Sequence, residues 1–574
     1  MPPSLWVTIE KFMQQVIWLL LFVILARILG PRPYGQFAIV MVFISCCEIV
    51  LVESTVEALL GMEPLQPMHL RTANLCTLSL SILAGCFFYL LAPLIGLAFG
   101  DAELGPIFQT LSVLPTISAL TSAPVAVLRS QLRFRPLAIR STLGLTIGGI
   151  CGLALALRGA GVWALVAQVI VQRAAEVIIL WSSAHTRFGI GWSRPHFVEL
   201  RHFATHLFVS RGLSFAGGQI PRLILGFFLG ASDLGLFVFA ARLPDMLALI
   251  TLAPTTLVAR STLRQYSPGQ KELEKAFGQL LQNTAFFAYP ICTGAAAIIP
   301  LFIVLALDSR WHPAILAAQL MILSVIPWMV YYGASAVLLA MKYPREEAKI
   351  SVGQVLSTTL CLLLAAPFGL NIVCFVLMVR YVALMPLPLW LIRRKCGIGL
   401  RPIVRAIGPS FIASAIMGSI VALASPFVAQ RLSPIAALPV LIGLGVIIYA
   451  ALAGILARQG ALQGHALEQF LVNGGMKGRA SRFSGRKPPS DGKGEGLHPD
   501  AVSQGARKAI ARPAWNWRIP AGALIVLMGA GGWFLWTLHG GGRLAEKPGQ
   551  TPLVHTVAAM GVISAAHAVP VGTH

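Results

Sequence analysis

Long apolar segments alternate with short polar ones over the first 457 residues of this 574-residue chain. Most apolar segments are about 20 residues long, the length that an α-helix needs to cross the hydrocarbon core of a bilayer. The pattern therefore predicts fourteen transmembrane helices, at residues 13–30, 37–59, 74–98, 105–128, 141–157, 160–183, 204–229, 234–259, 281–306, 313–341, 350–366, 370–391, 407–425 and 435–457.

A nine-residue stretch of this pattern occurs twice, 200 residues apart. The stretch Leu29-Gly-Pro-Arg-Pro-Tyr-Gly-Gln-Phe37 returns as Leu229-Gly-Ala-Ser-Asp-Leu-Gly-Leu-Phe237. In both copies an apolar run ends at a glycine, and a second glycine opens the next apolar run. Each copy predicts a helix-turn-helix hairpin at a membrane surface, in which Gly30 and Gly230 take the positive φ of a helix C-terminus.

A second echo lies downstream at nearly the same spacing. The residues Arg133-Phe134, Arg140 and Gly144 return as Lys342-Tyr343, Lys349 and Gly353, at an offset of 209. Short patterns of this kind also recur by chance in apolar chains, so neither echo alone decides the matter. Two echoes in the same order indicate a duplicated half, as in transporters that are built from structural repeats.

The composition is that of a membrane protein. Apolar residues make up 56% of the chain and charged residues 11%, with a mean hydropathy of +0.77. Soluble globular domains contain roughly 25% charged residues. The nine cysteines follow no disulfide or metal-site spacing, so we interpret them as small buried hydrophobes.

The net charge of +23 raises the question of a nucleic-acid partner. The lysines and arginines between the predicted helices concentrate in alternate loops. Up to residue 407, 21 of them lie on the side of the N-terminus. The loops on the other side contain only four: Arg32, Arg158, Arg310 and Arg431. This is the positive-inside pattern, which predicts a cytoplasmic N-terminus. The charge thus reflects topology, with anionic membrane lipids as a secondary partner, and no nucleic-acid partner is expected.

No motif of enzymatic chemistry is present. The chain lacks GxxxxGK[ST], GxSxG and HExxH, and it has no soluble domain large enough for an active site. We therefore expect no enzyme activity, no cofactor and no metal site.

Six arginines fall inside predicted membrane spans, where charged side chains normally face a bundle interior or an aqueous cavity. The planar guanidinium group matches phosphate and pyrophosphate, which favours an anionic cargo. Arg211 and Arg222 are eleven residues apart, so a straight helix would direct both to one face, about 16 Å apart in height. Two arginines have an acidic residue three positions later and are candidate ion pairs: Arg173 with Glu176, and Arg242 with Asp245. The cavity candidates are Arg211, Arg222, Arg380, Arg27, Arg173 and Arg242. For Arg380, the alternatives are that it snorkels to the interface or binds a carbonyl of another helix.

Three carboxylates lie within ten residues in the second predicted span. Glu53 and Glu57 share a helical face, whereas Glu48 lies about 140° away from Glu53 around a straight α-helix. Glu48 and Glu53 are candidates for coupling transport to a proton or sodium gradient. Alternatively, Glu57 and Glu53 lie at the cytoplasmic end of the span and are solvated there.

Four stretches together resemble one known family. They are Ala26-Arg27-Ile-Leu-Gly-Pro-Arg-Pro-Tyr-Gly35, the loop from Arg133 to Gly144, Gly161-Val-Trp-Ala-Leu-Val-Ala-Gln168, and Leu229-Gly-x4-Gly235. With the fourteen spans, they resemble the polysaccharide transporter family, the Wzx-like oligosaccharide flippases of the multidrug/oligosaccharidyl-lipid/polysaccharide flippase superfamily. The resemblance covers residues 1 to about 457.

This resemblance implies an all-α polytopic fold of two pseudo-symmetric six-helix bundles with two additional helices, working by alternating access. It implies a multi-pass protein of the bacterial inner membrane that moves undecaprenyl-diphosphate-linked oligosaccharide repeat units for surface polysaccharide or exopolysaccharide synthesis. Its further partners would be a polysaccharide polymerase and export machinery. The alternatives are an ion-coupled drug or metabolite exporter of the same architecture, and a non-transporting scaffold for polysaccharide assembly.

The last 117 residues do not continue the bundle. They contain a basic polar stretch and one more apolar run flanked by tryptophans. The tail after this run weakly resembles the start of a periplasmic adaptor (membrane-fusion) protein. The two interpretations are a functional appendage and a fusion or gene-boundary artefact. We predict an N-terminal bundle (1–200), a C-terminal bundle (201–395), two additional transmembrane helices (396–457), a disordered cytoplasmic linker (458–518), an extra transmembrane helix (519–538) and a short periplasmic tail (539–574).

Overall fold

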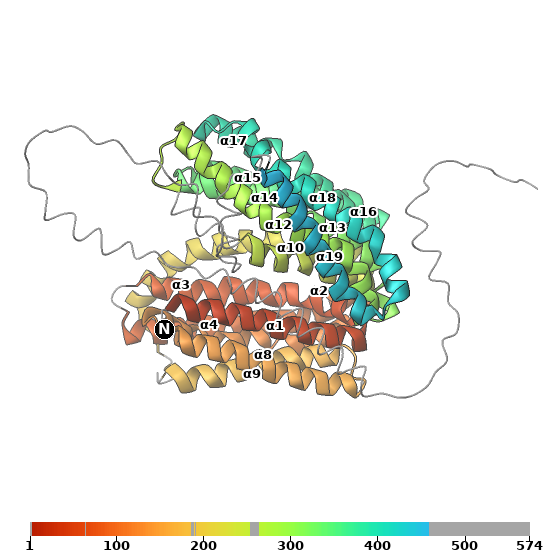
Figure 1. The fold of residues 1–574 in the computed structure, drawn as a ribbon. Coiled ribbons are helices and arrows are strands. Elements are labelled where there is room, and N and C mark those ends of the chain that lie inside the picture. Colours follow the sequence, from red (N-terminus) through yellow and green to blue (C-terminus); the bar gives the residue numbers. More distant parts are fainter. Residues whose placement is uncertain (1–2, 63–64, 185–188, 190, 253–262, 459–574) are drawn as a thin grey trace, which may run out of the picture. The chain divides into compact units, whose positions relative to one another are not determined.

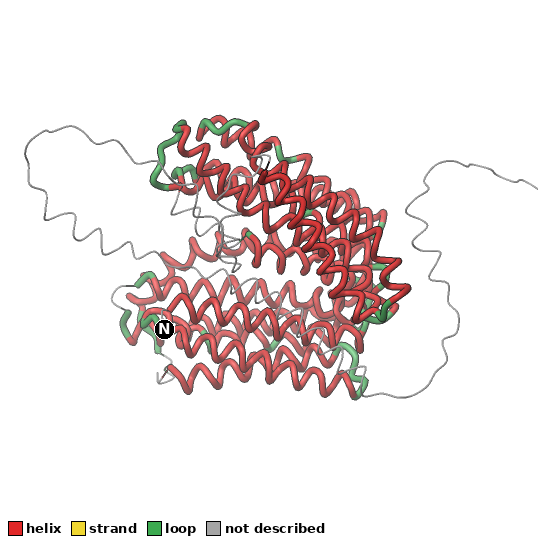
Figure 2. Tube along the Cα trace, in the orientation of Figure 1, coloured by secondary structure: helices red, strands yellow, loops and turns green. Residues whose placement is uncertain are grey.

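The computed structural model describes residues 3–62, 65–184, 189, 191–252 and 263–458, and every regular element in these ranges is a helix (Figures 1 and 2). The predicted linker beyond Arg458, the extra transmembrane helix and the tail lie outside the described residues. The helices up to residue 251 are α1 (Pro3–Leu29), α2 (Pro31–Cys47), η1 (Glu48–Glu53), α3 (Ser54–Leu60), α4 (Pro67–Ala98), α5 (Leu104–Leu111), α6 (Leu114–Ala119), α7 (Ser122–Ser130), α8 (Phe134–Leu157), α9 (Trp163–Ala184) and α10 (Arg194–Thr251). They are followed by α12 (Lys271–Ala306), η2 (Ser309–Trp311), α13 (Ala314–Leu323), α14 (Val325–Ala340), α15 (Pro344–Ala365), η3 (Ala366–Phe368), α16 (Leu370–Ala383), α17 (Pro386–Cys396), α18 (Leu400–Arg431) and α19 (Pro434–Arg458).

The all-α polytopic fold predicted from the sequence is confirmed. In the described part of the chain, twelve helical segments are long and apolar enough to cross a membrane, and a shorter apolar helix, Met13–Leu29, precedes them. Two predicted spans share α10, whose backbone stays helical through Pro221 and departs from helical geometry at Gly230. When α10 is divided at Gly230, these segments correspond to the fourteen predicted spans.

The outward faces of several helices are apolar. On α4, Leu83, Leu90 and Leu97 are 67%, 76% and 79% exposed, and on α15 Leu356 and Leu364 are 65% and 64% exposed. Water would oppose stripes of this size, whereas lipid accepts them. The chain is a multi-pass membrane protein.

The two copies of the nine-residue echo have the same backbone conformation. Gly30 has φ 78° and ψ −178°, and Gly230 has φ 81° and ψ 178°. An L-residue with a side chain rarely adopts this positive φ, so both turns depend on glycine. The predicted positive φ is confirmed in both copies.

The two echoes also pack against each other. A Cβ atom on Gly35 would overlap the backbone carbonyl of Ala231, and a Cβ atom on Gly235 would overlap the carbonyl of Pro31. Residues 31 and 35 of one copy correspond to residues 231 and 235 of the other, so the contact is reciprocal. The duplicated hairpins therefore meet across a local pseudo-two-fold axis, and the second glycine of each copy permits the close approach.

The second echo is confirmed with a change of register. Leu132 and Lys342 both have positive φ, 55° and 62°. Directly after them, the N–H of Arg133 donates to the carbonyl of Leu128 at 2.9 Å, and the N–H of Tyr343 donates to that of Leu338 at 2.8 Å. These matching helix ends are 210 residues apart. The offset of 209 was wrong by one residue, because similarity of side chains was matched instead of the backbone turn.

Helices α8 and α9 are held together by a glycine stripe. The two helices approach closely at these glycines, because added Cβ atoms would crowd polar residues of α9 that are spaced four apart. The facing residues are Gly144 with Glu176, Gly148 with Gln172 and Gln168, and Gly152 with Gln168. This stripe places Glu176 inside the N-terminal half.

Candidate functional site

Arg173, whose side chain is 30% exposed, lies at the centre of a partly buried ion-pair triad. Its Nη1 atom contacts Glu176 Oε2 at 3.1 Å, which confirms the pair predicted within α9, and its Nη2 atom contacts Glu48 Oε2 of η1 at 3.0 Å. The Ser118 hydroxyl donates to Glu48 Oε1 at 2.5 Å, and Gln172 Nε2 donates to Glu176 Oε1 at 2.9 Å. The side chains of Glu48 and Glu176 are only 13% and 5% exposed. Two carboxylates share one guanidinium, so the triad holds one excess negative charge when both are ionised.

The two coupling candidates lie in a π-helical turn. Residues Glu48–Glu53 form η1, a π-helix between α2 and α3. The straight α-helix assumed for their relative angle was therefore wrong, because a π-helix has i→i+5 hydrogen bonds and takes more residues per turn than an α-helix. Glu48 faces Arg173, whereas Glu53 is exposed. Single π-turns inside transmembrane helices often mark functional sites.

Arg211 of α10 forms an ion pair with Glu57 of α3. The side chains remain 41% and 32% exposed. Glu57 therefore has a cationic partner as well as partial exposure, and its predicted place at the cytoplasmic end stays a prediction. The charge of Arg211 is balanced by one carboxylate, whereas Arg173 contacts two carboxylates.

A second group of candidate arginines lies on α10. Arg222 is half-buried, and its Nη1 atom donates to Gln219 Oε1 at 2.6 Å. The guanidinium carbon of Arg242 lies 4.4 Å from the ring centroid of Trp18, a cation–π contact with α1. Asp245 interacts electrostatically with both arginines.

Arg380 of α16 is linked to the same group through Tyr381. The side chain of Arg380 stacks on the Tyr381 ring at 4.3 Å, and its Nη1 atom donates to the Gln354 carbonyl at 3.3 Å and to Ser357 Oγ at 3.2 Å. The Tyr381 side chain also lies in the neighbourhood of Asp245. Three arginines and one aspartate give this cationic cluster (Arg222, Arg242, Asp245 and Arg380) a net charge of +2.

The sixth candidate, Arg27, is exposed in the last turn of α1. The end of this helix is capped from the other half of the chain, which the sequence analysis did not foresee. Arg310 donates to the carbonyls of Leu29 and Ile28, both at 3.2 Å, and to that of Arg27 at 3.4 Å. Its neighbour Trp311 is fully buried, and its Nε1 atom donates to the Ala26 carbonyl at 2.9 Å. A cation at a helix C-terminus also interacts favourably with the helix dipole.

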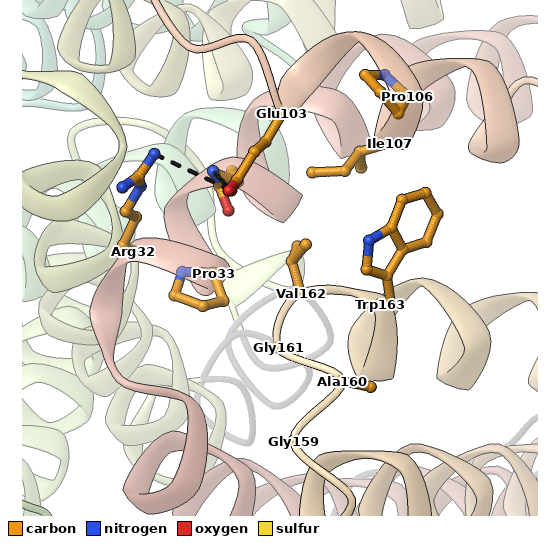
Figure 3. A pocket seen from close by; sticks show the side chains of 11 residues that line it. Arg32, Pro33, Glu103, Pro106, Ile107, Gly159, Ala160, Gly161, Val162 and Trp163 are labelled. Atoms are coloured by element: carbon orange, nitrogen blue, oxygen red, sulfur yellow. Dashed lines mark hydrogen bonds and ion pairs between the residues drawn. The ribbon is translucent and has the colours of Figure 1, made fainter.

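A cavity of about 360 Å³ lies within the N-terminal half. Figure 3 shows Arg32 and Glu103 on one side of it and Trp163 on the other, with Val162 between them. The Gly159–Gly161 turn before α9 lines its edge. No sequence signal had joined these residues, which come from three separate segments.

The sequence matches the model of a family described as polysaccharide biosynthesis protein, over residues 24–316, slightly more than half of the chain. It is 22% identical over 324 residues to the succinoglycan biosynthesis transport protein ExoT of Rhizobium meliloti (strain 1021). That alignment covers 55% of this chain and 66% of the relative, slightly less than two thirds of its length.

Two solved structures were compared with this chain, and the first shares its fold. The lipid II flippase MurJ, in an inward closed conformation, gives a TM-score of 0.64 at 13% identity, covering 79% of this chain and 98% of that chain. An inward-facing multidrug resistance transporter of the MATE family and MOP superfamily gives a TM-score of 0.49 at 15% identity, covering 73% of this chain and 99% of that chain. The likeness to MurJ shows a shared fold.

Proposed function

Because this chain belongs to the polysaccharide biosynthesis protein family, we propose that it moves lipid-diphosphate-linked oligosaccharide repeat units across the bacterial inner membrane by alternating access. The observation that carries the proposal is the family match over residues 24–316. A relative named for succinoglycan transport and the fold shared with a lipid II flippase support it. The lipid carrier would be undecaprenyl diphosphate.

The cationic cluster is our proposed site for the diphosphate. Arg222, Arg242 and Arg380 outnumber Asp245, so the cluster attracts an anion, whereas Arg173 and Arg211 already have carboxylate partners. Guanidinium groups bind phosphate oxygens in bidentate geometry. Of the six arginines that the sequence offered as cavity candidates, the proposed diphosphate site contains three, Arg222, Arg242 and Arg380.

The triad around Arg173 is our proposed coupling site. A carboxylate in excess over its cationic partner can take up a proton, which leaves Arg173 with one ionised partner. Glu48 is the better candidate for this proton than Glu53, because Glu48 is enclosed by Arg173 and Ser118. Proton uptake at the triad would shift the equilibrium between the inward-facing and outward-facing conformations only if the affinity of the triad for the proton differs between them.

The orientation of the protein is also proposed from its charges. The basic residues concentrate in the loops on the side of the N-terminus, which the positive-inside rule places in the cytoplasm. The Gly30 turn and the cap formed by Arg310 then lie on the opposite, periplasmic side.

Complementation of a deletion strain tests the diphosphate site. Arg222→Ala and Arg380→Ala should each abolish surface polysaccharide while the protein level in the membrane stays normal. The matched control is Arg394→Ala, since Arg394 lies in the last turn of α17 and stacks on Trp390. Full complementation by both cluster variants would contradict the proposed site, and export of drugs without polysaccharide rescue would favour the exporter alternative.

A further inference from the structure

We propose that the cavity between Arg32 and Trp163 binds carbohydrate, as a subsite for neutral or amino-bearing sugar rings of the cargo (Figure 3). The identity of the glycan rests on the proposed function, but the binding chemistry comes from the cavity itself. Its volume of about 360 Å³ is at the lower end of ligand sites, which run from roughly 300 to 1,000 Å³. A space of this size suits one or two sugar rings.

One wall of the cavity is a preorganised polar cluster. Gln36 is 1% exposed, and its Nε2 atom donates to Asp101 Oδ2 at 2.8 Å and to Glu103 Oε2 at 2.7 Å. Arg32 Nη2 lies 3.4 Å from Asp101 Oδ1 and 4.0 Å from Glu103 Oε2. A buried amide thus holds two carboxylates in place, while the side chains of Arg32 and Glu103 remain 60% and 64% exposed.

This polar wall has the hydrogen-bonding pattern that sugar hydroxyls require. Each hydroxyl is both a donor and an acceptor. The carboxylate of Glu103 can accept further hydrogen bonds, and the guanidinium of Arg32 can donate them. Adjacent hydroxyls of one ring could therefore bond to Glu103 and Arg32 together.

The opposite wall is flat and apolar. Trp163 is 43% exposed, and Pro106, Ile107 and Val162 extend the apolar surface around it. The apolar C–H face of a sugar ring packs well on an indole, because the ring has a negative face and a large contact area. Tryptophans at a membrane interface commonly contact lipid headgroups. Trp163 instead lines a cavity together with the carboxylate of Glu103 and the guanidinium of Arg32.

The charge of the cavity separates it from the diphosphate site. The charges of Arg32 and Glu103, which line the cavity, cancel, and Asp101, which contacts Arg32 and Gln36 beside the cavity, adds one negative charge, opposite in sign to the cationic cluster. A diphosphate would be repelled here, whereas a neutral or amino sugar would not. In the proposed orientation the cavity lies toward the periplasmic end, next to the Gly30 turn, where the glycan arrives after crossing.

Binding of the delipidated glycan to the full-length protein in nanodiscs tests this proposal. The probe is the repeat-unit oligosaccharide that mild acid releases from the host's lipid-linked precursor, measured by saturation-transfer NMR and calorimetry. Wild type should bind it, and Trp163→Ala and Glu103→Gln should each weaken binding about tenfold. Trp390→Ala is the control, because Trp390 is a similarly exposed tryptophan outside the cavity, 52% against 43%.

The outcomes separate this proposal from the proposed function. Absence of glycan binding by wild type, equal affinity in Trp163→Ala, or displacement of the glycan by inorganic pyrophosphate would each overturn the cavity assignment. Trp163→Phe, which keeps an aromatic ring, should bind nearly as well as wild type and guards against loss of folding. A protein that flips lipid-linked oligosaccharide but ignores the free glycan refutes the cavity assignment alone, whereas a protein that flips nothing refutes the proposed function.

Discussion

Replacing Arg173 by methionine should destabilise the protein strongly. Glu48 and Glu176 would then face each other with side chains 13% and 5% exposed and without the cation that both contact. Removing one partner of a buried ion pair costs about 3–5 kcal/mol, because an uncompensated charge is left behind. We expect the free energy of unfolding of Arg173→Met to fall by about this amount.

Neutralising the carboxylates should largely reverse this effect. The triple variant Arg173→Met, Glu48→Gln and Glu176→Gln contains no charge at the triad, and uncharged replacements of similar volume are often close to neutral in stability. Glu48→Gln alone keeps the contact between Arg173 and Glu176, and its amide oxygen can still accept from Ser118. We expect this single variant to fold normally and to have lost the response of transport to an imposed proton gradient.

Thiol labelling during heating measures the stabilities. Cys292, Cys374 and Cys396 are buried, so a thiol-reactive dye reports their exposure on unfolding, above the signal of the more accessible cysteines. Wild-type stability in Arg173→Met would refute the buried triad. If Glu48→Gln transported cargo with an unchanged response to the proton gradient, the triad would be structural and the coupling assignment would be wrong.

The contact between the echoes and the helix cap give two further predictions. Gly35→Ala should lower thermal stability, since overpacking against backbone costs about 1–3 kcal/mol. The control is Gly278→Ala, which meets open space and should change the melting temperature little. Equal melting curves for the two variants would contradict the close contact at Gly35. Arg310→Ala should speed hydrogen exchange in the peptide around Gly30, because the α1 carbonyls lose their donor. Arg158→Ala, in an exposed loop on the same side, should leave this exchange unchanged, and protection that survives in Arg310→Ala would show that the cap is unimportant.

Local pattern was sufficient for the helices and the duplication. Apolar runs of membrane length predicted the spans, and the paired glycines predicted the positive φ of Gly30 and Gly230, because both features depend on neighbouring residues. The reciprocal packing of Gly35 and Gly235 was not predictable in this way. It joins residues about 200 positions apart, and only the assembled helices bring them together.

The candidate site shows the same limit. The sequence identified the intramembrane charges and the pair of Arg173 with Glu176, which lie on one helix. It could not show that Glu48 completes this triad from 125 residues away, or that Arg211 has Glu57 as its partner. The arginines best placed for an anionic cargo emerge only after these ion pairs are known.

Translocation in proteoliposomes tests directly whether this protein moves lipid-diphosphate-linked oligosaccharide across a membrane. Purified protein is reconstituted with a fluorescent lipid-diphosphate-linked oligosaccharide, and the fraction that becomes accessible to a quencher on the opposite side is followed over time. We expect translocation by wild type well above that of protein-free liposomes, with Arg222→Ala and Arg380→Ala close to that background. Wild-type rates equal to those of empty liposomes would contradict the claim that this chain carries such a cargo.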